Sequence, residues 1–198
     1  LRFIYTIIGE SHVFGDPLVQ NAFIVLALTG IFVASTAAIF QDNVKRLLAY
    51  SSIAQVGYIV VGVSFASMDG LTGGLVHVFN HAIMKGGLFM AVGCVAYRTG
   101  TVDFDDLRGL GRRQPFTAAA LVVGGLGMIG VPLTVGFVSK WYLVLAALDR
   151  GSPSIAILLL LSSLLALVYL WKLIEVGCFQ EPPSDVEPGE APLAMLIP

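Results

Sequence analysis

The chain has 198 residues, of which 12% are charged and 57% are hydrophobic, and its formal net charge is −2. Soluble domains carry about 25% charged residues, so this chain has too few charges to cover a soluble surface. Its mean hydropathy of +0.87 excludes a disordered chain, and its charge leaves no basic face for nucleic acid. The composition therefore predicts a protein that crosses a lipid bilayer several times.

Apolar runs long enough to span a bilayer, which takes about 20 residues per helix, follow one another along the chain. They cover residues 18–40, 47–66, 71–97, 115–148 and 154–179. Residues 1–8 and 192–198 resemble parts of two further helices. Because both ends interrupt apolar runs, we expect residues 1–198 to be a single transmembrane domain that is a fragment of a longer protein. The predicted fold class is all-α, a polytopic transmembrane helix bundle.

The basic residues between these runs predict the orientation of the bundle. One side carries Lys45, Arg46, Arg98, Arg108, Arg112 and Arg113, and the opposite side carries only Arg150. Basic loops remain in the cytoplasm. We therefore expect the loops 41–46 and 98–114 to be cytoplasmic, in an integral protein of the prokaryotic plasma (inner) membrane.

The run 115–148 is too long for one straight span and too short for two. As one helix it would be about 51 Å long, against a hydrocarbon core of about 30 Å. Its middle holds Gly130 and Pro132, with Gly136 just after them. Proline interrupts a helix and glycine permits other backbone geometries, so we predict a discontinuous span broken near 130–133. Broken helices commonly mark ion sites, although a simple proline kink is the alternative.

The run 71–97 carries three titratable residues on one face, near its middle. His77, His81 and Lys85 are spaced at i, i+4 and i+8 and drift by about 40° per step around a helix. They form a stripe about 12 Å long. Histidine exchanges protons near neutral pH, and a buried lysine releases its proton more readily than an exposed one. The stripe predicts a proton wire, whereas a single histidine would more often be a packing residue.

Three further ionisable residues lie within the apolar runs, where such residues are functional candidates by default. Lys140 follows the predicted break by eight residues and is a candidate proton donor or acceptor, with snorkelling to the membrane surface as the alternative. Lys172 and Glu175 are three residues apart, so a local ion pair is one interpretation. Lys172 remains a second candidate for the proton pathway.

Other polar residues favour structural roles. Ser51, Ser52 and Gln55 lie in the run 47–66, and such residues more often join membrane helices than carry ions. Cys94 and Cys178 lie in apolar runs without metal-ligand spacing. We therefore expect no catalytic residue, metal site or cofactor in this chain.

Three segments resemble, in chain order, one family of membrane subunits. Residues 41–58, Gln-Asp-Asn-Val-Lys-Arg-Leu-Leu-Ala-Tyr-Ser-Ser-Ile-Ala-Gln-Val-Gly-Tyr, are similar to a signature of the antiporter-like subunits. These are the N-, M- and L-type subunits of respiratory complex I (NADH:quinone oxidoreductase), the A- and D-type subunits of Mrp-type Na+/H+ antiporters, and their membrane-bound hydrogenase counterparts. Residues 77–89 resemble the family's helix with central histidines and a lysine, and residues 130–140 resemble its second broken helix, whose lysine faces the proton exit.

The resemblance implies a fold of 14 helices in two inverted five-helix repeats, of which this chain would be the second half. It also implies proton conduction from Lys85 through His81 and His77 to Lys140, with other membrane subunits as partners and Na+ as a candidate second ion. The family's Glu–Lys pair of the first repeat lies outside this sequence. A non-conducting structural anchor is the alternative function. Any oxidoreductase activity would belong to the complex, because the chain holds no redox motif.

Overall fold

The structure is a computed structural model that describes residues 7, 9, 13–182 and 189–196. Its long helices are α2 (Pro17–Ile39), α3 (Val44–Ser64), α4 (Met68–Thr99), α6 (Pro115–Ile129), α7 (Val135–Asp149) and α8 (Pro153–Phe179). The short pieces η2 (Phe104–Leu107), α5 (Leu110–Arg113) and α9 (Leu193–Leu196) lie between or after them. These ranges contain helices and no strand, so the predicted all-α bundle is confirmed. Most of the expected partial helix 1–8 lies outside the described residues.

Local sequence determines where the long helices begin. Asn43 caps α3 by accepting hydrogen bonds from the N–H groups of Lys45 and Arg46. Ser67 caps α4 in the same way through the N–H of Gly70. Because of this cap, α4 starts at Met68, three residues before the predicted start of the run 71–97.

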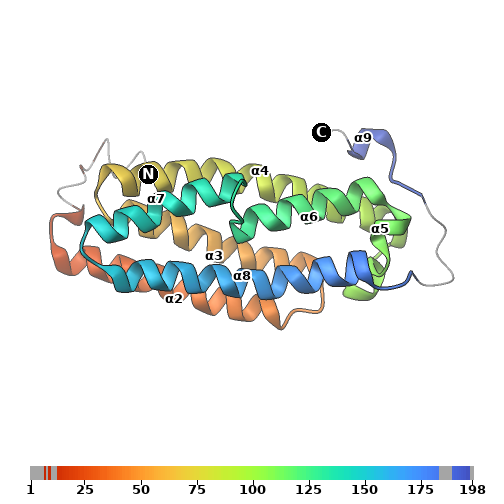
Figure 1. Ribbon diagram of the computed structural model, residues 1–198, viewed down its shortest axis with the longest axis horizontal. Helices are drawn as coiled ribbons and strands as arrows, with labels where there is room; N and C mark the ends of the chain where they lie inside the picture. Colours follow the sequence, from red (N-terminus) through yellow and green to blue (C-terminus); the bar gives the residue numbers. More distant parts are fainter. Residues whose placement is uncertain (1–6, 8, 10–12, 183–188, 197–198) are drawn as a thin grey trace.

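The helices run along the long axis of the molecule (Figure 1). Neighbours in space follow the order α2, α3, α4, the pair α6 and α7, then α8, which returns to α2. Helix α3 also contacts α7 and α8, so it lies inside the group. The helices α2, α3, α4 and α8 are each long and apolar enough to cross a membrane. Helices α6 and α7 are 15 residues each and lie end to end, so they form one interrupted rod.

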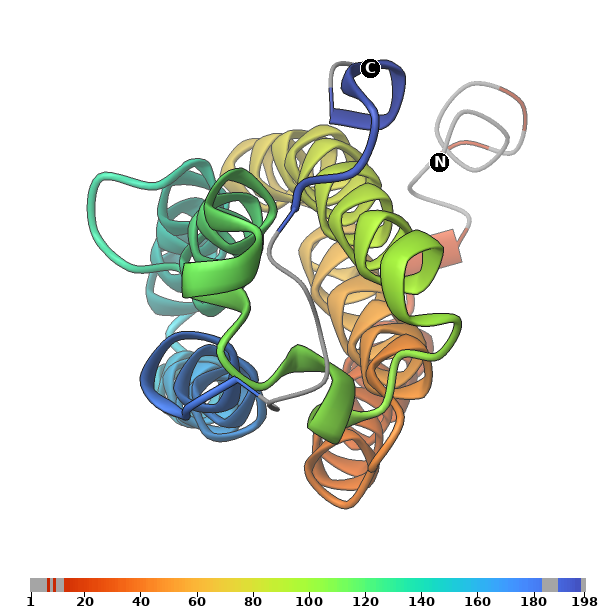
Figure 2. The same cartoon turned by 90° about the vertical axis from the view of Figure 1, so that its right-hand side faces the viewer.

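One end of the bundle carries the basic residues of the loops and helix ends, Lys45, Arg46, Arg98, Arg108, Arg112 and Arg113. It holds the connection from α2 to α3, η2, α5 and the end of α8 (Figure 2). Within it, the buried Arg113 donates to the carbonyls of Asp106 and Arg108. Burial lowers the pKa of the Arg113 guanidinium. Glu190 accepts from the N–H of Phe116 at the start of α6.

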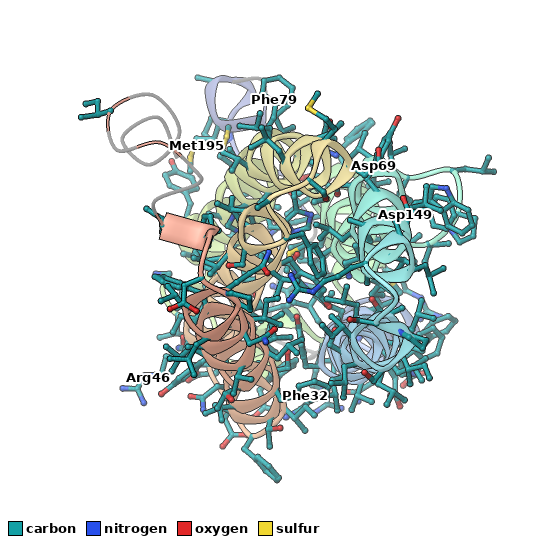
Figure 3. All side chains as sticks on the ribbon, turned by 90° about the vertical axis from the view of Figure 1, so that its left-hand side faces the viewer. Phe32, Arg46, Asp69, Phe79, Asp149 and Met195 are labelled. Atoms are coloured by element: carbon teal, nitrogen blue, oxygen red, sulfur yellow. The ribbon has the colours of Figure 1, made fainter. Side chains whose placement is uncertain are left out.

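The other end is marked by Asp69 and Asp149 (Figure 3). Asp69 lies in the first turn of α4, and Asp149 is the last residue of α7. Arg150 follows Asp149 and donates to the Asn21 side chain. The charged residues outside the spans therefore collect at the two ends of the bundle, and the polar groups described next lie between them.

Candidate functional site

The rod of α6 and α7 is interrupted at residues 130–134, which we call the break. Gly130 ends α6 with a φ of 85°, and its N–H donates to the carbonyls of Leu126 and Gly127. Glycine commonly ends helices in this left-handed conformation because it has no Cβ. Leu133 also has a positive φ, 76°, a conformation that is uncommon for a leucine. The predicted discontinuous span is therefore present, with a true break rather than a kink.

Lys140 fills the hydrogen-bonding gap that Pro132 creates. In a continuous helix the carbonyl of Met128 would accept from the N–H of residue 132, but proline has no N–H. The Nζ of Lys140 donates instead to the carbonyls of Met128 at 3.0 Å and Ile129 at 2.9 Å, and to the hydroxyl of Ser163 at 3.1 Å. A lysine ammonium has three donors, and here each has an acceptor.

Two further features favour a positive charge on Lys140. The end of a helix carries partial negative charge on its free carbonyls, and these are the carbonyls that Lys140 contacts. Its Nζ also lies 4.7 Å from the centre of the Tyr58 ring, within cation–π range. Gly130 leaves room for the side chain, because a Cβ there would come within 2.9 Å of the Lys140 Cδ.

Gly136 brings the two halves of the rod together. A Cβ at Gly136 would overlap the carbonyl oxygen of Gly127, so only glycine permits this close approach. Asn80 of α4 fixes the same region by donating to the carbonyl of Val135 at 2.7 Å. The three predicted hinge positions therefore have separate structural roles. Gly130 turns the chain, Pro132 leaves the Met128 carbonyl without a backbone donor, and Gly136 permits the close contact between α6 and α7.

Lys85 is the second buried lysine and lies on the side of α4 that faces α3. Only 6% of its surface is exposed. Its Nζ donates to the carbonyl of Leu48 and to the hydroxyl of Ser51, and it lies 5.8 Å from the Phe89 ring centre. Neither Lys85 nor Lys140 has a carboxylate partner among the described residues. The ion pair found among those residues joins Lys172 to Asp42.

His77 is held between two polar side chains of neighbouring helices. Its Nε2 lies 2.8 Å from the Gln55 Oε1, and its Nδ1 lies 2.8 Å from the Ser139 Oγ. A neutral imidazole donates from one nitrogen and accepts at the other. Both tautomers can be accommodated here, because the Gln55 amide offers oxygen or nitrogen and the Ser139 hydroxyl can donate or accept. His77 therefore has a polar neighbour at each ring nitrogen, one from α3 and one from α7.

His81 lies beside this chain of contacts. Its ring stacks on that of His77 with centres 6.4 Å apart, a face-to-face arrangement in which no hydrogen bond joins the two rings. Its buried Nε2 has no hydrogen-bond partner in the described part of the chain. The predicted direct sequence of Lys85, His81 and His77 is therefore not hydrogen-bonded in this structure.

Helix α3 supplies polar groups that the sequence interpretation assigned to helix packing. Ser51 and Gln55 contact Lys85 and His77, as described above, and Tyr58 lies under Lys140 with its ring 5.4 Å from that of His77. We call Ser51, Gln55 and Tyr58 the α3 polar face. They are spaced at i, i+4 and i+7, the spacing of one helix face, and this signal could have identified them. The α3 polar face lies between the two buried lysines.

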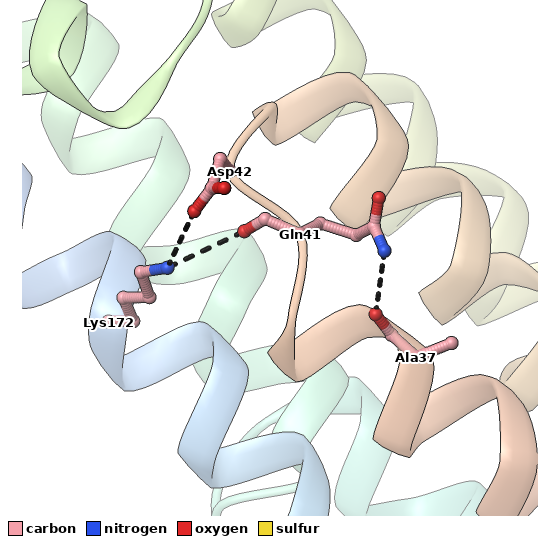
Figure 4. A network of polar contacts seen from close by, with 4 residues as sticks. All are labelled: Ala37, Gln41, Asp42 and Lys172. Carbon is pink, nitrogen blue, oxygen red and sulfur yellow. Dashed lines mark hydrogen bonds and ion pairs between the residues drawn. The ribbon is translucent and has the colours of Figure 1, made fainter.

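Lys172 lies apart from these residues, near the end of the bundle that carries the basic loops. Its Nζ lies 3.7 Å from the Asp42 carboxylate and 3.5 Å from the Gln41 carbonyl oxygen (Figure 4), and 4.3 Å from the centre of the Phe104 ring. The interpretation of Lys172 and Glu175 as a local ion pair is wrong, because Lys172 turns toward the loop between α2 and α3. Glu175 is exposed. The described residues contain no cluster of metal ligands.

Comparisons with known proteins match this chain along most of its length. The family described as "NADH:quinone oxidoreductase/Mrp antiporter, TM" matches residues 3–166. The NADH-quinone oxidoreductase subunit N of Desulforudis audaxviator is 42% identical over 87% of this chain and 37% of its own length. The chain thus spans well under half the length of this curated relative.

Solved structures agree with the sequence match. A chain of the respiratory complex I structure from Thermus thermophilus, with bound NADH, is 28% identical with a TM-score of 0.84, over 94% of this chain and 39% of that one. A chain of the Mrp complex from Dietzia sp. is 29% identical with a TM-score of 0.79, over 86% and 32%. This chain is therefore an integral membrane protein that belongs to the NADH:quinone oxidoreductase/Mrp antiporter transmembrane family.

Proposed function

We propose that this chain is part of a proton-conducting, antiporter-like membrane subunit. The observation that carries the proposal is the pair of buried lysines, each held by carbonyls and hydroxyls rather than by a carboxylate. Taking an ammonium out of water costs several kcal/mol. A lysine kept for packing alone would be replaced by an apolar residue without loss, whereas one that gains and releases a proton needs this kind of environment.

In this proposal protons pass between Lys85 and Lys140 through the α3 polar face and His77. Lys140 is the exchange site at the break, where its neighbours are carbonyl ends and hydroxyls that accept hydrogen bonds. Lys172 is the entry residue, because it lies 41% exposed beside Asp42 at the end with the basic loops. The excess of basic residues supports a cytoplasmic position for that end, in loops 41–46 and 98–114.

The partners would be other membrane subunits of a multi-subunit complex in a prokaryotic plasma membrane. The solved relatives are chains of an Mrp complex and of respiratory complex I, and several curated relatives carry names of NADH-quinone oxidoreductase subunits. These names support a complex of the NADH:quinone oxidoreductase type, with an Mrp-type complex that also moves Na+ as the second candidate. Any redox chemistry would be that of the partner subunits.

The test uses the complete complex in everted membrane vesicles, with proton transport followed by a pH-sensitive dye. Lys85→Met and Lys140→Met keep the length and apolar stem of the side chain while removing the exchangeable proton. Each is expected to reduce transport more than tenfold while the subunit still assembles. Lys45→Met is the matched control, because the same substitution at this exposed lysine should leave transport unchanged. Wild-type transport in both buried variants would reject conduction and leave the structural anchor as the function.

A further inference from the structure

Tyr169 of α8 is a buried residue that neither the sequence motifs nor the path described above includes. It is 1% exposed, and its hydroxyl has no hydrogen-bond partner among the described residues. The side chains near this hydroxyl include those of Gln55, Ser51 and Tyr58, all from α3. The Nε2 of Gln55 is also buried and also lacks a partner among those residues. Two unpaired polar atoms from different helices therefore lie in one small region.

This region coincides with the gap in the path between the two lysines. On one side, Ser51 contacts Lys85. On the other, Gln55 contacts His77. No hydrogen bond in the described structure joins Ser51 directly to Gln55. The hydroxyl of Tyr169 lies beside both, so it is placed where the two halves of the path must be connected.

Physical chemistry limits what these two atoms can do. A buried polar group left without a hydrogen bond destabilises the fold, and such groups are nearly always paired with protein or with water. A tyrosine hydroxyl both donates and accepts, whereas a lysine ammonium and an amide nitrogen only donate. Tyr169 is therefore the group in this region that can accept from Gln55 while donating to Ser51, directly or through one water molecule.

We propose that Tyr169 is a positioning residue of the proton path, whose hydroxyl orders the connection between Ser51 and Gln55. This inference rests on the proposed proton conduction. Tyr169 also lies three residues before Lys172 on α8, so the two side chains are neighbours on one side of the helix.

The test is Tyr169→Phe in the complete complex, because this substitution removes the hydroxyl and retains the ring. We expect proton transport to fall at least threefold, with the amount of assembled complex and its thermal stability unchanged. The solvent deuterium isotope effect on the transport rate should rise, because proton transfer through the altered connection becomes the slow step. A tyrosine that serves only in packing would move neither quantity. Tyr50→Phe, on the exposed side of α3, is the control.

Lys140→Met measured in parallel separates the two hypotheses. Loss of transport in Lys140→Met together with wild-type transport and isotope effect in Tyr169→Phe would reject the role of Tyr169 and retain conduction. Wild-type transport in Lys140→Met would reject conduction itself, and the role of Tyr169 with it. If Tyr169→Phe lowers the amount of assembled complex in proportion to transport, the residue is structural and the inference is wrong.

Discussion

Gly136 lies two residues after the break, and we expect it to be the position of the rod that tolerates substitution least. A Cβ introduced by Gly136→Ala would overlap the carbonyl oxygen of Gly127, and a backbone oxygen cannot rotate away as a flexible side chain can. The two halves of the rod would have to move apart where Gly136 meets Gly127. Overpacking of this kind costs about 1–3 kcal/mol.

The displacement would also reach Lys140, one turn later on α7. Its contacts with Met128 and Ile129 are 3.0 and 2.9 Å long, so a shift of about 1 Å takes them beyond hydrogen-bonding range. A hydrogen bond to a charged group contributes about 1.5–3 kcal/mol. With overpacking and the loss of at least one of these two bonds, Gly136→Ala should destabilise the subunit by about 2.5–6 kcal/mol and abolish proton transport.

Two measurements on the purified complex test this prediction: its melting temperature and its proton transport after reconstitution into vesicles. Gly86→Ala is the matched control, because a Cβ at Gly86 of α4 meets nothing within 4 Å and alanine favours a helix by about 1 kcal/mol over glycine. The reasoning is refuted if Gly136→Ala melts at the same temperature as Gly86→Ala and transports protons at the wild-type rate.

Two smaller effects are expected at the end with the basic loops. Lys172→Met should lower the free energy of unfolding by less than about 1 kcal/mol, because the ion pair with Asp42 is exposed. It should slow proton transport only severalfold, since protons can also enter from water. Complete loss of transport in vesicles would contradict this expectation. Asn43→Ala should lower the free energy of unfolding by about 0.5–2 kcal/mol, because it removes the cap of α3. The measurement is the melting temperature, which should fall. An unchanged melting temperature would show that water replaces the cap.

The break could be predicted from the sequence because its causes are local. Pro132 lacks a backbone donor wherever it stands, and Gly130 adopts a positive φ without strain. These two properties limit the helix before them to Ile129, which is where α6 ends. Gly136 could be named from the sequence, but its close approach to Gly127 could not, because Gly127 belongs to the other half of the rod and only the packing of α6 on α7 brings the two together.

The polar contacts between the two lysines could not be predicted, because they depend on how α3, α4 and α7 meet. The spacing of His77, His81 and Lys85 places them on one side of α4, and this encouraged a wire along that helix. In the structure the ring of His81 stacks on His77, while Ser51 of α3 takes the contact with Lys85. A stripe on one helix indicates which side is polar, but the partners come from the helix that packs against it.

Lys172 shows the same limit at the end of the bundle. Its spacing from Glu175 allowed a pair within one helix, but on α8 Lys172 points toward the exposed Asp42 of the loop between α2 and α3, while Glu175 is exposed elsewhere on the helix. The loop that carries Asp42 is distant in sequence and is brought close by the packing of α2 against α8. A local pair of charges is a reliable prediction only where no other element competes for one of them.

Pro132 and Lys140 together determine the hydrogen bonding at the break. The proline leaves the Met128 carbonyl without its backbone donor, and the lysine supplies a donor from the following helix half. A charged Lys140 has three N–H donors for its three acceptors, whereas a neutral amine has two and loses its attraction to the Tyr58 ring. Removing the proton takes away one of these donors, so one of the three contacts is lost or, at Ser163, reverses so that the hydroxyl donates to the amine. The geometry of the break and the protonation of Lys140 are coupled by this count of donors, so a change at either one must alter the other.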